Sequence, residues 1–78
     1  MESACTLAAG ITAVDAAALY TSTGDPITKF DVIQIDSERL VVIFVDTGNN
    51  SLLIGRGYGG TTAAIHAIAA PILRWGSV

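Results

Sequence analysis

Residues 39–56, RLVVIFVDTGNNSLLIGR, decide the fold class of this chain. Five of the seven residues at 39–45 are β-branched or aromatic, a composition that favours a strand. Residues 46–50 are rich in Gly and Asn, which tolerate positive φ, and therefore predict a turn. Residues 51–56 are expected to form the partner strand. The stretch as a whole predicts a β-hairpin.

Shorter β-segments are expected on both sides of this hairpin. Residues 31–36 partly alternate polar and apolar side chains, as a half-buried strand does. Residues 71–75 form a last short strand, with a proline at its first position or on an edge. In the Ala-rich segment 6–21, the β-branched residues and Gly10 favour two short strands over a helix, with a turn near 14–16.

Polar turns at residues 23–26 and 36–38 separate these strands. The sequence therefore predicts an all-β fold. We expect a small antiparallel β-sandwich or barrel of five or six short strands, with a Gly-rich turn and room for one short helical turn near residues 61–68. Residues 1–78 are expected to form a single β-rich structural domain.

The composition points to assembly with other subunits. The chain is 51% hydrophobic and 14% charged, so it has little polar material to coat a small monomer. It has one cysteine, which allows no intrachain disulfide, and no Cys/His cluster for a structural zinc. Small domains without such supports are usually stabilised by oligomerisation or by docking on a larger surface.

The charge pattern argues against several partners. The net charge is −3 and the four basic residues are scattered, so no direct nucleic-acid binding is expected. The apolar runs are too short to span a membrane, and no membrane association is expected. The N-terminus lacks the positive start of a signal peptide, which predicts use in a cytosol-like compartment or on a particle assembled there.

The segment GRGYGG at residues 55–60 matches the glycine pattern of dinucleotide-binding loops. Such a loop also needs a following helix, a second parallel strand and an acidic residue about 20 positions further on. No Asp or Glu follows Asp46, and no Lys follows the glycines as a P-loop requires. No cofactor is therefore expected.

The other candidates for chemistry have simpler structural interpretations. His66, flanked by Ala and Ile, is expected to hydrogen-bond backbone groups in a turn, because no partner spacing for catalysis is recognisable. The acidic residues Asp31, Asp36 and Glu38 do not match a calcium loop and are interpreted as a solvated turn, so no metal is expected. Cys5 is interpreted as a small apolar residue or an idle thiol rather than a nucleophile.

Two aromatic residues are candidates for an interface. Tyr58 and Trp75 could anchor a partner, because aromatic side chains often contribute much of the binding energy. Either side chain could equally belong to the core.

One stretch resembles a known family. Residues 56–67, RGYGGTTAAIHA, followed by Ala-Pro-Ile at 70–72, resemble a recurrent β-module of tailed-bacteriophage structural proteins. That module reads roughly Arg-Gly-x-x-Gly-Thr-x-Ala-Ala-x-His-Ala. The likeness covers roughly residues 6–75, and the family often has Gly where this chain has Ala at 69–70. The motif positions to which the resemblance gives a structural role are Arg56, Gly57, Gly60, Thr61 and His66.

The resemblance implies a virion component rather than an enzyme, without catalytic residues. A free-standing module of this size most resembles a capsid decoration, or cement, protein. Such proteins commonly form homotrimers on the outer face of the head, where they bridge subunits of the major capsid protein. The expected location is then the capsid surface of a virion assembled in the host cytoplasm. Other phage parts (neck, head fibre or tail) and a small host-factor-binding domain remain alternatives.

For the fold, we expect Arg56 and His66 to tie the long glycine-rich turn to the sheet by hydrogen bonds to backbone carbonyls. Such bonds matter in a small domain, because truncating a buried hydrogen-bonded residue costs about 1–3 kcal/mol.

Overall fold

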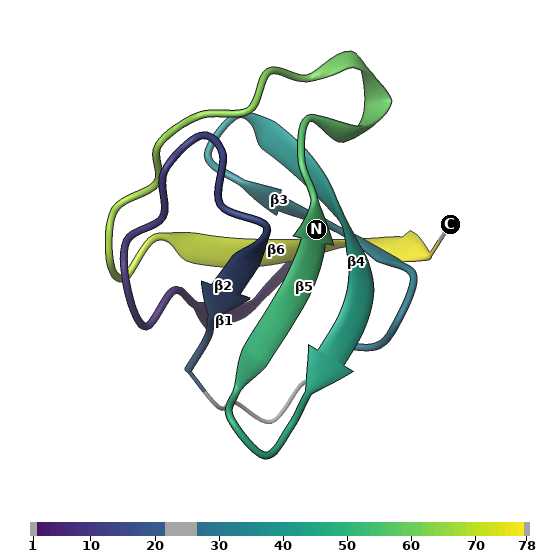
Figure 1. Cartoon of the computed structure of the whole chain (residues 1–78). Helices are drawn as coiled ribbons and strands as arrows, with labels where there is room; N and C mark the ends of the chain where they lie inside the picture. Colours follow the sequence, from purple (N-terminus) through teal and green to yellow (C-terminus); the bar gives the residue numbers. More distant parts are fainter. Residues whose placement is uncertain (1, 22–26, 78) are drawn as a thin grey trace.

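The computed structural model describes residues 2–21 and 27–77 as one curled, antiparallel β-sheet of six strands (Figure 1). The spatial order is β1-β6-β3-β4-β5-β2. The predicted all-β fold is confirmed, in the form of a half-barrel. The elements in chain order are β1 (Glu2–Thr6), β2 (Ala17–Leu19), β3 (Asp31–Ile35), β4 (Glu38–Asp46), β5 (Ser51–Gly55), the 3₁₀ turn η1 (Tyr58–Gly60) and β6 (Pro71–Ser77).

Strands β1 and β2 form the two edges of the sheet, and the chain just after each of them comes together. An isolated bridge joins Leu7 to Tyr20, and Thr6 and Thr21 exchange backbone and hydroxyl hydrogen bonds. Figure 1 shows the resulting curl, with β2, β5 and β4 in front and β6 passing behind them. Pairing of this kind satisfies edge N–H and C=O groups that would otherwise face water.

The core lies inside this curl. The inward positions of β4 and β5 follow the period of two expected for strands, with Leu40, Val42, Leu52 and Ile54 buried. Each fully buried aliphatic side chain contributes roughly 1.5–3 kcal/mol relative to its exposure. The other apolar residues of the cluster are Cys5, Leu7, Ile11, Ala18, Ile27, Ile33, Ile35 and Ile72.

The predicted hairpin is confirmed and slightly extended. Strand β4 begins one residue earlier than expected, at Glu38, and pairs with β5 over the turn at 47–50. Asn50 has φ of 49°, as the Asn-rich turn predicted. A bulge leaves Ile43 without a partner on β5, because Val42 pairs with Ile54 and Phe44 with Leu53. The bulge increases the local bend of β4, which helps the sheet curl.

The N-terminal segment differs in detail from expectation. Strand β1 runs from Glu2 to Thr6, before most of the Ala-rich stretch, and β2 covers Ala17–Leu19. The turn between them falls at residues 13–14, close to the predicted position. The turn expected at 23–26 lies outside the described residues. The helical turn is η1 at Tyr58–Gly60, just before the expected 61–68.

The turn before β6 has an alanine at a position that usually takes glycine. Ala70 N donates to Ala67 O across a four-residue turn, and Ala69, at its third position, has φ of 71°. That position in a type II turn normally takes Gly, because an L-residue with a Cβ atom is strained there. The turn is therefore kept at a conformational cost.

Replacing Ala69 by Gly should stabilise the protein. We expect Ala69→Gly to raise the free energy of unfolding by about 0.5–1 kcal/mol. Glycine removes the left-handed strain of the folded state, and part of this gain is lost because glycine also gives the unfolded chain more conformational freedom. Denaturant unfolding of both proteins measures the difference. Ala67→Gly, in the same turn at a position without positive φ, is the matched control and should be destabilising. A loss of stability in both variants would contradict the assignment of strain to Ala69.

Candidate functional site

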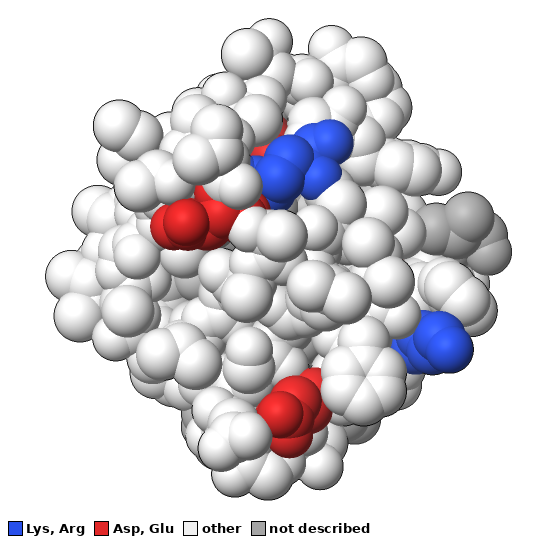
Figure 2. All heavy atoms as spheres, in the orientation of Figure 1, with Lys and Arg blue, Asp and Glu red and all other residues white. Residues whose placement is uncertain are grey.

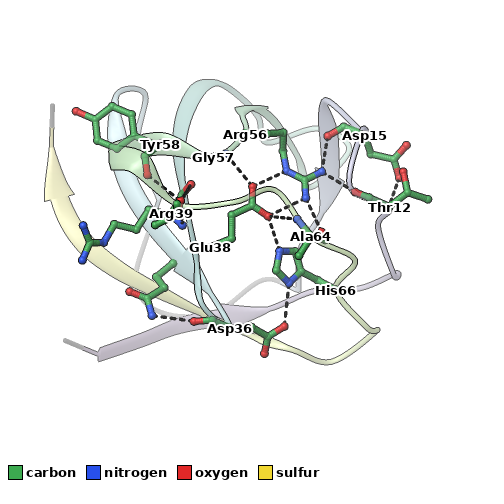
Figure 3. A network of polar contacts seen from close by, with 12 residues as sticks. Thr12, Asp15, Asp36, Glu38, Arg39, Arg56, Gly57, Tyr58, Ala64 and His66 are labelled. Carbon is green, nitrogen blue, oxygen red and sulfur yellow. Dashed lines mark hydrogen bonds and ion pairs between the residues drawn. The ribbon is translucent and has the colours of Figure 1, made fainter.

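The segment between β5 and β6 folds over one end of the sheet and closes around the side chain of Glu38. We call this group the Glu38 lock; it comprises Glu38, Arg56, His66 and Asp36 (Figure 3). Glu38 is the first residue of β4, and its side chain is 0% exposed. Because a buried carboxylate without partners would be very costly, the donors around it are the central feature of the site.

Arg56 uses all five of its N–H groups in this site. Its Nε and Nη2 atoms donate to the two oxygens of Glu38, both at 2.8 Å, in a bidentate ion pair. The remaining donors reach three backbone carbonyls, those of Thr12 at 2.6 Å, Asp15 at 2.9 Å and Ala64 at 2.7 Å. The expected bonds from Arg56 to backbone carbonyls are thus present. The guanidinium fork suits this role, since it offers five donors in a fixed plane.

Glu38 accepts five hydrogen bonds. Besides Arg56, the backbone N–H groups of Gly57 and Ala64 donate to it at 2.9 and 3.0 Å, and His66 Nε2 lies 2.7 Å from Oε1. Burial alone would raise the pKa of Glu38, but the bonds from Arg56, Gly57, His66 and Ala64 outweigh burial and lower this pKa to about 2. The carboxylate is therefore ionised throughout the neutral and mildly acidic range.

His66 bridges two carboxylates instead of binding backbone with its ring, which corrects the expectation from the sequence. Nδ1 lies 2.8 Å from Asp36 Oδ2, and Nε2 lies 2.7 Å from Glu38 Oε1. Ionised carboxylates only accept hydrogen bonds, so a ring nitrogen that carries a proton donates to the carboxylate beside it. The backbone of His66 also pairs with that of Ile11. His66 thus links β4, the preceding turn and the N-terminal segment.

The other motif residues shape the turn that carries these groups. Gly57 has φ of 62°, and a Cβ atom there would lie 2.9 Å from Thr61 O, so only glycine fits. Thr61 Oγ1 accepts from Arg39 N at 3.0 Å and donates to Tyr58 O at 2.8 Å. Gly60 takes no part in the lock, but its φ of 81° continues the turn. The motif residues therefore form one structural unit around β4.

The acidic residues interpreted as a solvated turn have three different environments. Glu38 is buried in the lock, and Asp36 is an exposed residue whose carboxylate contacts His66. Asp31 is also buried, where it accepts from the backbone and hydroxyl of Thr28 and lies 3.5 Å from Arg74 Nε. Two of the three residues are therefore part of the folded interior, and the solvated-turn interpretation was wrong for them.

The side chain of His66 in the lock is enclosed and has polar partners within the protein. His66 is 1% exposed and both of its ring nitrogens are engaged, so in this conformation it cannot exchange a proton with a bound ligand. Burial raises the pKa of the Cys5 thiol to about 11, so the thiol is not ionised near neutral pH. Within residues 2–21 and 27–77, no group of three or more His, Cys, Asp or Glu residues could hold a metal ion.

The glycine pattern of residues 55–60 leads into the single turn η1 rather than an α-helix. A dinucleotide loop places its phosphates at the N-terminus of a helix, which this segment does not provide. In the described part of the chain, no helix is long and apolar enough to cross a membrane.

Sequence reasoning identified Arg56 and His66 but missed their common partner. The signal was present, because Glu38, Leu40 and Val42 occupy alternate positions of one strand, and the last two are obviously inward-facing. Extending the strand by one residue would have placed Glu38 inside. Arg39 was also missed; it lies on the outward side, 4.1 Å from the Trp75 ring centroid.

Comparison with known proteins adds no assignment. No protein-family model matches the chain, and no curated protein matches it either.

Neutralising Glu38 should destabilise the fold strongly. Glu38→Gln keeps the shape of the side chain, but it turns an NH2 group toward N–H donors and leaves the Arg56 guanidinium without its counter-charge. Breaking one partner of a buried ion pair costs about 3–5 kcal/mol, so we expect the free energy of unfolding to fall by that order. Chemical denaturation with fluorescence from Trp75 measures it.

The matched control for this change is Asp36→Asn. It removes the other carboxylate that contacts His66, but the Asp36 side chain is 59% exposed, and exposed pairs contribute about 0–1 kcal/mol. If both variants lost the same stability, the buried carboxylate would not be the centre of the lock.

The depressed pKa of Glu38 predicts acid sensitivity. The folded-state pKa lies near 2, below the ordinary value of 4.5, so the ionised group stabilises the fold above pH 4.5. That contribution, roughly 3 kcal/mol from the size of the shift, should disappear as the pH falls from 4.5 towards 2. Unfolding free energies measured along this range should decline for the parent and decline less for Glu38→Gln. Parallel curves for the two proteins would contradict the prediction.

Proposed function

We propose that this protein is a virion structural protein that decorates a bacteriophage capsid and braces the head shell by bridging subunits of the major capsid protein. The observation that carries the proposal is an apolar outer face on the sheet. Strands of an antiparallel sheet that face water normally carry polar outward side chains. Here the outward positions of β2, β5 and β4 include Leu19, Leu53, Ile43 and Phe44, which are between 42% and 54% exposed.

These side chains lie next to one another across the three strands. Phe44 pairs with Leu53, and Leu53 pairs with Ala17, so the row crosses β4, β5 and β2 without a charged residue. Figure 2 shows this face, in the orientation of Figure 1, as a mostly uncharged surface, with one cluster of acidic and basic groups above the middle of the view and separate charged groups below it and at the right edge. A contiguous apolar surface on so small a domain is typical of a protein–protein contact.

The resemblance to phage structural modules suggests that the partner of this apolar face is a phage capsid. Two of its motif residues, Arg56 and His66, belong to the Glu38 lock and a third, Gly57, donates to Glu38, so several of the similar positions stabilise this fold. Each new interface of ordinary size buries about 1,600 Å² in total, repeated around a shell. On this proposal the protein assembles as a homotrimer on the capsid surface.

Binding to phage heads tests the proposal directly. Purified protein mixed with expanded heads from the same source, stripped of the protein, should co-sediment saturably with them. Leu53→Glu places a charge in the apolar row and should weaken binding by at least about tenfold, because charges are costly in the core of an interface. The variant should keep the circular dichroism of the parent, since Leu53 is not a core residue.

Thr62→Glu adds the same charge at an exposed position outside the sheet and serves as the control. It should bind as the parent does. Failure of the parent to bind these heads would overturn the proposal. Density for the chain at the neck, head fibre or tail in a particle map would replace it with the alternative phage roles.

A further inference from the structure

A second surface feature lies on the opposite side of β4 from the Glu38 lock. An open pocket of about 220 Å³ is lined by Val32, Arg39, Tyr58, Trp75, Gly76 and Ser77. We call it the Trp75 pocket. Ligand and cofactor sites usually enclose about 300–1,000 Å³, so this pocket suits one side chain of a larger partner. It brings together Tyr58 and Trp75, the two aromatic residues that the sequence marked as interface candidates.

The position of Trp75 depends on a bulge in β6. Val32 pairs with Gly76 and Ile33 with Arg74, so Trp75 is the additional residue on its strand. Bulges redirect side chains and are common next to binding sites. Its indole Nε1 donates to Gln34 Oε1 at 2.6 Å, and Gln34 Nε2 donates to the carbonyl of Asp36 at 2.8 Å. A half-exposed tryptophan is thereby held in one orientation.

Arg39 completes the wall of the pocket. It lies opposite Gln34 in the β3–β4 register, and its guanidinium stacks over the Trp75 ring at 4.1 Å. Figure 3 shows Arg39 and Tyr58 directed to the same side, away from the lock. Among the described residues, no ion pair includes Arg39 and its guanidinium donates no side-chain hydrogen bond, whereas Arg56 uses every donor. The pocket thus holds an oriented cation with free donors.

We infer that the Trp75 pocket binds the carboxylate of an Asp or Glu side chain on a segment of a partner protein. Trp, Tyr and Arg are the side chains most enriched among residues that dominate binding energy, and here Trp75 and Arg39 are held by side-chain contacts before binding. The Arg39 guanidinium, with its unused N–H groups, matches one carboxylate in bidentate geometry. The rings of Tyr58 and Trp75 would cover the aliphatic part of the bound Asp or Glu side chain. A polyanion is a poorer match, because the chain is acidic overall and the pocket has a single cation.

The indole signal of Trp75 provides a direct test, because the chain contains one tryptophan. The probe is N-acetyl-glutamate N-methylamide, and the glutamine analogue is its neutral control. Titration followed by ¹⁵N NMR should give a saturable shift of the Trp75 Nε1–H signal with the glutamate probe and little shift with the glutamine probe. An equal response to both probes, or no saturable response to the glutamate probe, would overturn the inference.

Variants assign the response to Arg39. Arg39→Gln should weaken binding of the glutamate probe by about tenfold or more, whereas Arg74→Gln, which removes the same charge from β6, should change it by less than about twofold. Arg39→Lys keeps the charge but loses the fork, so its affinity should fall between the parent and Arg39→Gln. The Lys variant also keeps the test decisive if Arg39→Gln folds poorly. Equal losses in Arg39→Gln and Arg74→Gln would show a non-specific charge effect and overturn the inference.

A dilution series of the protein alone identifies the remaining alternative. If the Trp75 signal shifted with protein concentration and Arg39→Gln abolished that shift, the occupant would be a second copy of this chain, not a partner segment. The titration contains no phage particle, so its outcome is independent of head binding. The Trp75 pocket can therefore fail this test while the proposed function stands, and the reverse also holds.

Discussion

The buried ion pair between Glu38 and Arg56 is the interaction on which the rest of this structure depends. A carboxylate with no exposed surface requires a full set of donors, and those donors come from Arg56, the turn after it and His66. Arg56 in turn holds the carbonyls of Thr12 and Asp15, so the N-terminal segment is fixed through the same charge. The lock connects parts of the chain that the sheet itself does not pair.

Strand alternation gives two neighbouring charged residues different roles. Glu38 points into the half-barrel and Arg39 points out, as successive residues of a strand must. One therefore organises the interior and the other lies on the Trp75 ring at the surface. The turn that closes the lock also carries Tyr58, so the geometry of the outer pocket is set by the same segment. The buried lock and the geometry of the Trp75 pocket are therefore coupled through two adjacent positions.

The sequence predicted the hairpin well because both its strands and its turn have strong local preferences. It predicted the N-terminal strands poorly, because alanine favours neither strand nor turn and the position of β1 is set by pairing with β6. Because Arg56 and His66 flank a glycine-rich turn, the sequence could suggest that they hold this turn against the sheet. Their partner could not be identified from local composition, since the Asp-Ser-Glu run at 36–38 also fits a solvated turn. Only the inward register of β4 decides that Glu38 is buried.

The contacts of the lock join residues far apart along the chain. Arg56 binds Glu38 across 18 positions, His66 reaches it across 28, and Arg56 reaches Thr12 across 44. Such contacts form late, because the entropy of closing long loops must be lost before any bond is gained. A half-assembled lock would also contain a desolvated carboxylate with too few donors, which is a state of high free energy. Partly folded forms are therefore poorly populated, and the small domain should fold slowly but as a single cooperative unit.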